Sequence, residues 1–354
     1  MRISRKFKQL TRFTYPHGTE TSLLKYLPTG YKEDGLGNYY LKIGETSTMF
    51  TCHLDTACSY SKRVNHIEED GFIKTDGTTI LGADDKAGMT VMLYMIEKNI
   101  PGLYYFFVGE EVGCVGSGKL SNKWLEYDFS NYIKKVVSFD RRGTDSVITE
   151  QMFGVCCSNE FATELSNQLN LVNKEFNFSP DPTGIYTDSA KFMDLVPECT
   201  NISVGYYNEH STNEKQDINF LRKLCQAVCK VDWENLPIVR DHLDVTNWND
   251  DYDFDFDDDS DDIWSEDNYS YFKGENGVEK LHISTSYINE EKSLIYNWLV
   301  TSNIYPGFKS ILWNGNSLYV ENGKLLEYVG DRTDLSEYLS DLSSVPMSAL
   351  KKLK

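Results

Sequence analysis

Short apolar runs alternate with amphipathic segments along the first two-thirds of the chain. Runs rich in β-branched and aromatic residues lie at 38–43, 49–53, 103–108, 136–139 and 201–204, and we expect each to be a strand. Residues 85–97 carry apolar side chains at the 3.6-residue period of a helix, and residues 161–169 and 213–231 show a similar pattern. Strands that alternate with helices predict an α/β fold, with a mostly parallel mixed sheet and helices on both of its faces.

The character of the sequence changes beyond about residue 236. Residues 250–267 contain eleven acidic residues and no Lys or Arg, and without them the net charge of −19 falls to −8. Such dense like charge resists packing, so we expect an acidic linker over 237–268. Further β-rich runs at 310–313, 317–320 and 325–329, the first two joined by Asn314-Gly315, predict a small C-terminal α+β domain over 269–354. The first domain then covers residues 1–236.

Composition excludes several classes of protein. So acidic a chain lacks the cationic face that nucleic acid needs, and no run reaches the roughly 18 apolar residues of a membrane span. The basic N-terminus is not followed by the apolar stretch of a secretory signal, so we expect a cytoplasmic protein. None of the eight cysteines forms a Cys-x-x-Cys pair, which favours reduced thiols over disulfides or structural zinc. The sequence does not indicate an oligomeric state.

Residues able to do chemistry gather at the ends of the predicted strands and at the start of one helix. In chain order these groups are His53-Leu54-Asp55, Gly82-Ala83-Asp84-Asp85-Lys86-Ala87-Gly88, Gly109-Glu110-Glu111, Asp140 and His210. Each group alone also fits a capped strand, a capped helix or an exposed acidic loop. Open α/β sheets, however, bind ligands beyond the carboxyl ends of their strands, so five such groups in one order point to a single site.

The residue types in these groups are those of a metal site. Two histidines and three carboxylates, one of them bridging, suit a pair of borderline divalent ions such as Zn²⁺, with Co²⁺ or Mn²⁺ as alternatives. Two metal ions a few ångströms apart can share a hydroxide and stabilise the tetrahedral intermediate of amide hydrolysis. Consecutive side chains diverge at a strand end, so one of Glu110 and Glu111 can bind metal while the other moves a proton.

The ordered set of motifs resembles the di-zinc exopeptidase superfamily, including peptidase T and the compact bacterial aminopeptidases, over about residues 15–235. The string Gly-Ala-Asp-Asp-Lys-Ala-Gly is especially similar to peptidase T, and Glu214 follows His210-Ser211 as in the family. The resemblance implies metal ligands at His53, Asp84, Glu111, Asp140 and His210, with Asp84 bridging both ions. It also implies that Asp55 orients His53, that Glu110 is the base activating a metal-bridging water, and that the Asp84–Asp85 peptide bond is cis.

The chain departs from peptidase T between the fourth and fifth ligands. Only 70 positions separate Asp140 from His210, which leaves room for a helix, a loop over 179–186 and a strand, but not for a lid domain. We therefore expect a metallopeptidase-like catalytic domain over 1–236 that cleaves peptides as a zinc-dependent aminopeptidase.

Two other functions stay open at this stage. The same metal site would serve a deacylase or amidohydrolase acting on an N-acyl amino acid, and Arg141 and Arg142 are candidates to bind a substrate carboxylate. The chain could instead be a non-catalytic binding protein that works through its acidic segment.

Overall fold

A computed structural model describes residues 1–152 and 154–242 and, beyond them, five strands. The chain divides into two compact units, Met1–Tyr252 and Asp253–Lys354. The candidate residues for chemistry all lie in the first unit.

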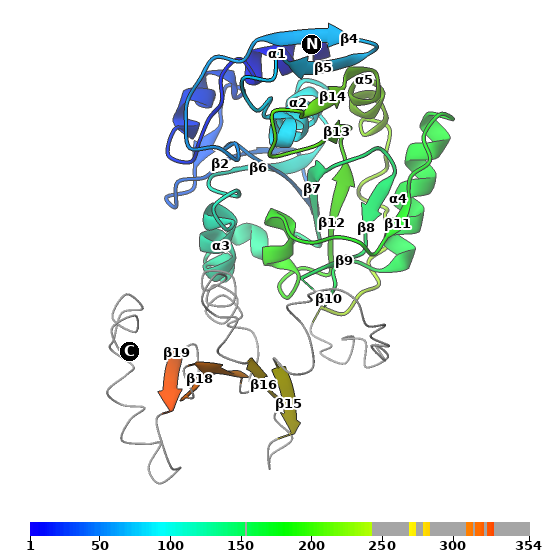
Figure 1. The fold of residues 1–354 in the computed structure, drawn as a ribbon. Helices are drawn as coiled ribbons and strands as arrows, with labels where there is room; N and C mark the ends of the chain where they lie inside the picture. The colour runs from blue at the N-terminus through cyan, green and yellow to red at the C-terminus, as the bar shows by residue number, and fades with distance from the viewer. Residues whose placement is uncertain are drawn as a thin grey trace, which may run out of the picture. The chain divides into compact units, whose positions relative to one another are not determined.

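The first unit is built on an eight-stranded mixed sheet (Figure 1). In spatial order the strands are β1 (Lys32–Glu33), β2 (Tyr39–Ile43), β6 (Gly102–Phe107), β3 (Thr48–His53), β7 (Lys135–Arg141), β12 (Glu198–Ser203), β8 (Ser146–Ile148) and β11 (Ser179–Asp181). The four central strands β6, β3, β7 and β12 run parallel, whereas antiparallel pairs join β1 to β2, β2 to β6 and β12 to β8. The predicted mostly parallel mixed sheet is confirmed, and all five predicted strands are present.

Helices cover both faces of this sheet and enclose two hydrophobic cores. Helices α1 (Ile3–Leu10), α2 (Ala83–Glu97), α4 (Asn159–Val172) and α5 (Ile218–Ala227) contribute to one core. Helix α3 (Val115–Asn122) and the short 3-10 segments η2 (Trp124–Glu126), η3 (Asp128–Asn131) and η4 (Asp188–Phe192) contribute to the other. Met49 and Phe50 are adjacent on β3 yet belong to different cores, because successive side chains of a strand face opposite sides.

A second, four-stranded antiparallel sheet was not predicted. Its order is β13 (Tyr206–Tyr207), β14 (Lys215–Asp217), β5 (Phe72–Thr75) and β4 (His66–Glu69). It also corrects the helix predicted over 213–231, which begins only at Ile218. Residues 215–217 pair with β5 as a strand, and the Asp217 carboxylate then caps α5 by accepting the backbone N–H groups of Asn219 and Phe220.

The segment between Asp140 and His210 folds back into the main sheet. It forms β8, the short pair β9 (Glu150–Gln151) and β10 (Gly154–Val155), then α4, β11, η4, β12 and β13. The predicted helix and strand are therefore present, and the 179–186 loop contains the additional edge strand β11, which pairs in parallel with β8.

The described part of the second unit consists of strands. They are β15 (Tyr269–Lys273) paired with β16 (Glu279–Ile283), and a three-stranded sheet of β17 (Lys309–Trp313), β18 (Asn316–Glu321) and β19 (Lys324–Tyr328). The last three coincide with the predicted β-rich runs. The acidic segment 249–268 and any helical part of this unit lie outside the described residues. Among the residues that are described, no helix has both the length and the apolar character to cross a bilayer.

Candidate metal centre

Five elements of the first unit bring the predicted site residues to one edge of the main sheet. His53 is the last residue of β3, Asp140 lies near the end of β7, and Glu110 and Glu111 follow β6. His210 comes from the loop after β13 and has a left-handed backbone, with φ of 59°. Because β3, β6 and β7 are parallel, their carboxyl ends meet here, as the sequence predicts.

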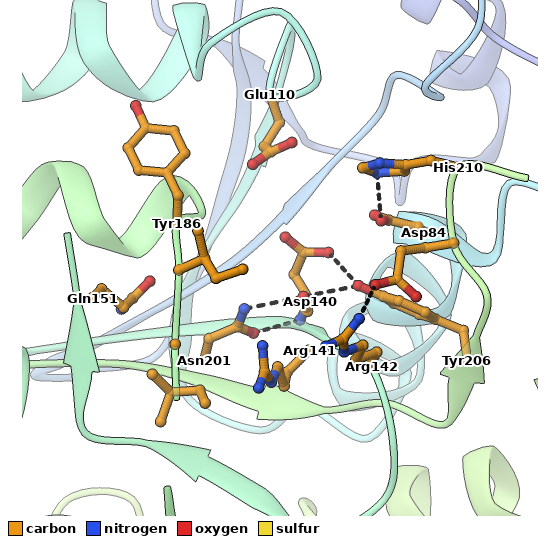
Figure 2. Close-up of a pocket in the computed structure, with 14 residues that line it drawn as sticks. Asp84, Glu110, Asp140, Arg141, Arg142, Gln151, Tyr186, Asn201, Tyr206 and His210 are labelled. Carbon is orange, nitrogen blue, oxygen red and sulfur yellow. Dashed lines mark hydrogen bonds and ion pairs between the residues drawn. The ribbon is translucent and has the colours of Figure 1, made fainter. Parts of the chain in front are cut away.

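The Asp84 carboxylate lies between two histidines. Its Oδ1 is 2.8 Å from Nε2 of His53, and its Oδ2 is 3.2 Å from Nε2 of His210. Figure 2 shows the contact between Asp84 and His210. Asp84 belongs to the first turn of α2 but has non-helical dihedral angles, and the Asp84–Asp85 peptide bond is cis, as the family resemblance implies.

Each histidine also faces a second carboxylate. Asp140 Oδ1 is 3.7 Å from His53 Nε2, while Glu111 Oε2 is 3.1 Å from His210 Nε2. The structure thus brings all five predicted ligands together as two groups that share Asp84, one with His53 and Asp140 and the other with Glu111 and His210. Nearby ligand atoms of His53, Asp84 and Glu111 lie within 4.8 Å of one another.

Asp85 has a different role from its neighbour, although it is also buried. Its Oδ1 accepts the backbone N–H of Gly88, and its Oδ2 accepts the backbone N–H of His53. A metal-sized grouping of His53, Asp85 and Asp140 also exists, but the oxygens of Asp85 are committed to backbone amides. Of the two adjacent aspartates, Asp84 is therefore the one available to a ligand.

The site carries more buried negative charge than its side chains can balance. Burial raises the pKa of Asp140 to about 6 and holds the pKa of Glu110 well above its usual range. Hydrogen bonds to Asp84 and Glu111 raise the pKa of His210 to about 11. Glu111 Oε1 is buried and has no hydrogen-bond partner. Carboxylates crowded in this way are neutralised either by protons or by a bound cation, and a set of imidazole and carboxylate donors fits divalent zinc.

Two further buried carboxylates hold the backbone around the ligands. Asp55 Oδ1 and Oδ2 accept the backbone N–H groups of Glu110 and Glu111, both at 3.1 Å, and Oδ1 lies 3.3 Å from Nδ1 of His53. This last contact is an ion pair and not a hydrogen bond, but it places a carboxylate at Nδ1 and leaves Nε2 for the ligand side. Glu214 accepts the backbone N–H groups of Leu81, Gly82 and Asp84, and therefore fixes the loop that carries Asp84.

Asp140 is held by residues that the sequence pattern did not single out. Thr187 Oγ1 donates to its Oδ2 at 2.6 Å, and the Tyr206 hydroxyl donates to its backbone oxygen at 3.0 Å. Asn201 accepts the Asp140 N–H and donates to the Asp140 carbonyl, as Figure 2 shows. Buried Asp188 lies next to Thr187, and burial raises its pKa to about 7. No motif or period in the sequence pointed to Thr187 or Asp188.

Glu110 stands across the site from Asp140, beside a pocket of about 220 Å³. Its Oε2 is 4.0 Å from His53 Nε2, and its Oε1 accepts a long hydrogen bond of 3.5 Å from the Cys114 thiol. Glu110 is therefore close to the two groups that share Asp84 but is not part of either. Tyr186, which also lines the pocket, lies next to Glu110 in Figure 2.

Both predicted substrate-binding arginines line this pocket, but each has a protein partner. Arg141 donates through Nη2 to the carbonyl and the hydroxyl of Thr183, and the same nitrogen is 3.6 Å from Asp181. Arg142 is more exposed and pairs with Glu209 at 3.1 Å. Their charges are therefore partly compensated within the protein.

Comparison with known proteins identifies the fold of the chain. No model of a known protein family matches the chain. The uncharacterized protein YqjE of Bacillus subtilis is 44% identical over 89 residues, 23% of this chain and 24% of YqjE, so the match spans about a quarter of that relative. Aminopeptidase PepT of Bacillus cereus superposes with a TM-score of 0.53 at 19% identity, covering 66% of this chain and 98% of PepT. The chain has the fold of a peptidase.

A tripeptidase of Staphylococcus aureus agrees, with a TM-score of 0.55 at 19% identity and coverage of 66% of this chain and 97% of the tripeptidase. The resemblance to peptidase T and its α/β fold is thus confirmed. At this identity the likeness concerns the fold, and the roles of individual residues are argued from the geometry described above.

Proposed function

We propose that the chain is a two-metal exopeptidase of the aminopeptidase type. One ion would be held by His53, Asp84 and Asp140, and the other by Asp84, Glu111 and His210. The observation that carries this proposal is that the two oxygens of Asp84 face two different histidines, at 2.8 and 3.2 Å. A carboxylate that serves only to orient one imidazole does not need its second oxygen directed at another.

Zinc ions bound there would polarise the scissile carbonyl and lower the pKa of an attacking water. Glu110 would accept the proton of that water and later pass it to the leaving amine, because its carboxylate faces the same space without joining either ligand group. Asp55 would hold His53 and the backbone of Glu110 and Glu111 in position through its three contacts.

The charged residues of the pocket do not by themselves separate a free amine from a carboxylate. Glu209 can attract an α-ammonium group but is paired with Arg142, and Arg141 is held by Thr183. The aminopeptidase is proposed over the deacylase because the chain shares its fold with aminopeptidase PepT, and the peptide comparison below separates the two. The binding-protein alternative depends on the acidic segment, which lies outside the described residues.

The first test measures metal content together with hydrolysis of free-amine peptides and their N-acetylated counterparts. We expect up to two zinc ions per chain, with activity lost on chelation, restored by zinc, cobalt or manganese, and confined to the free-amine peptides. Full activity in the metal-free protein would end the proposal, and faster cleavage of the acetylated peptides would instead favour the deacylase.

The adjacent glutamates give a sharper test. Glu110→Gln should keep both metal ions while turnover falls by on the order of a hundredfold or more, because the variant loses only the base. Glu111→Gln should weaken one metal site, and Glu126→Gln, on a surface segment with its side chain 68% exposed, serves as the control. If Glu110→Gln loses metal while Glu111→Gln loses only turnover, the two roles are reversed. If neither variant differs from the control, this loop is not part of an active site.

A further inference from the structure

The end of the pocket away from Asp84 and His210 is formed by a short wall centred on Gln151 (Figure 2). Gln151 belongs to β9 and is 1% exposed. Its Nε2 donates to Ser189 Oγ at 3.2 Å, and the Ser189 backbone N–H is in turn held by Ser138 Oγ. The amide of Gln151 is thus anchored on one side, and its Oε1 is left without a hydrogen-bond partner.

A second unpartnered group lies on the same pocket. Arg141 Nε is buried and has no acceptor, although Nη2 of the same guanidinium is fixed by Thr183. Residue 184 lets the two groups share a wall: a Cβ at Gly184 would lie 2.2 Å from the Glu150 carbonyl and 3.3 Å from Gln151 Cγ. Only glycine therefore allows the segment that holds Arg141 to pack directly on the strand of Gln151.

Buried donors and acceptors without partners are uncommon, because a polar group that loses its water without gaining a new partner destabilises the fold. Here the two residues that carry such an acceptor and such a donor line the pocket that also contains the candidate metal ligands. A group that satisfies both must offer a donor and an acceptor; an amide does so through separate N–H and C=O groups, and a hydroxyl offers both on one atom. A carboxylate would oppose Gln151 Oε1, an ammonium would oppose the guanidinium of Arg141, and a thioether would satisfy neither group.

We infer that this wall is a specificity subsite that recognises an amide group of the substrate. It rests on the proposed exopeptidase function and extends it to substrate class. The amide comes either from the side chain of a glutamine or asparagine or from a peptide bond beyond the scissile one. Both atoms are buried in the free protein, so a substrate amide reaches them only when the surrounding side chains shift, and it then supplies the two missing hydrogen bonds.

The test compares kcat/KM for three pairs of peptides that differ in one amide. Gln-Ala against Met-Ala and Ala-Gln against Ala-Met report on a side-chain carboxamide, because methionine has a similar length without polar hydrogens. Ala-Ala-Ala against Ala-Ala reports on a second peptide bond. We expect at least one pair to favour the amide by about 10- to 100-fold, and Gln151→Met to reduce that ratio to near one.

Matched variants separate recognition from folding. Gln168→Met makes the same exchange on α4, where Gln168 contacts Glu164 and Asp232, and should leave the ratio unchanged. Arg141→Lys keeps a positive charge but removes Nε. It should lower the same kcat/KM ratio that Gln151→Met lowers. Metal content and the unfolding midpoint of each variant are measured alongside, so that a ratio is compared only among folded, metal-loaded proteins.

Calorimetric binding of free glutamine and methionine repeats the comparison without hydrolysis. The metal-loaded protein could cleave no peptide and still bind glutamine more tightly than methionine. If Gln151→Met abolishes that difference, the exopeptidase proposal fails and the subsite stands. If peptides are cleaved but all ratios are near one, or survive both Gln151→Met and Arg141→Lys, the subsite is overturned and the exopeptidase proposal stands.

Discussion

Replacing Glu214 with glutamine should loosen the loop that carries Asp84. The Glu214 side chain is fully buried, and its two oxygens accept the N–H groups of Leu81, Gly82 and Asp84 at 2.7–2.9 Å. A glutamine has one oxygen, so its best orientation keeps the bonds to Leu81 and Gly82 and turns an NH₂ group toward the Asp84 N–H. One buried donor then loses its acceptor and faces another donor.

The size of the effect follows from these bonds. An unpaired buried N–H costs about 1–3 kcal/mol, and exchanging a charged acceptor for a neutral one weakens the remaining two bonds. Burial raises the pKa of Glu214 to about 8, so near neutral pH the residue is already partly protonated and the exchange for a neutral side chain costs correspondingly less. We therefore expect a net loss of about 2 kcal/mol in the free energy of unfolding. For a unit of this size that lowers the midpoint of thermal unfolding by about 4–8 °C.

Glu198→Gln is the matched control. Glu198 is also a fully buried carboxylate that accepts backbone N–H groups, those of Ser158, Val239 and Arg240, but it lies at the opposite end of β12 from the site. Both variants should unfold at lower temperature, and only Glu214→Gln should also lose metal affinity, by about 10- to 100-fold. Thermal unfolding and zinc titration measure the two effects. Equal zinc affinity in the two variants would refute the idea that Glu214 acts through Asp84.

Two smaller changes test the groups around Glu110. Asp55→Asn removes one of the two oxygens that receive the N–H groups of Glu110 and Glu111, so zinc affinity should fall by about tenfold or more, and an unchanged titration would contradict this role. Cys114→Ala removes the thiol that donates to Glu110 Oε1, so kcat should fall by about two- to fivefold with little change in KM. Cys114→Ser should restore kcat, and a KM effect without a kcat effect would show that the thiol does not position the base.

The sequence predicted the main sheet well because its strands are continuous apolar runs. The β-rich runs at β3, β6 and β7 are buried on both faces, which leaves little choice of structure. The second sheet was missed because its signals are weak: β4 is His-Ile-Glu-Glu and mostly exposed, and β14 is three residues long. Such strands form because distant partners pair with them, and a single-sequence pattern does not record those partners.

The residues of the candidate site likewise divide into those that the sequence pattern could place and those that it could not. His53, Glu110, Glu111 and Asp140 could be placed together because strand ends in a parallel sheet converge on one edge. Thr187 and Gln151 could not, since they lie beside a 3-10 turn and in a two-residue strand that have no period of their own. They reach the site only because the 141–209 segment returns to the main sheet.

The buried carboxylates of the site fall into two classes, and the distinction explains how it tolerates so much charge. Asp55, Asp85 and Glu214 have their oxygens bound by backbone N–H groups, and these bonds build the frame of the site. Asp84, Glu111 and Asp140 turn an oxygen toward His53 or His210 instead, and Glu111 keeps one oxygen unpaired. The backbone N–H groups that bind the first class hold the loops of the site in place. They are therefore not available to the carboxylates of the second class. The charge of the second class is therefore balanced most readily by cations bound between the two histidines, where Asp84 already faces both.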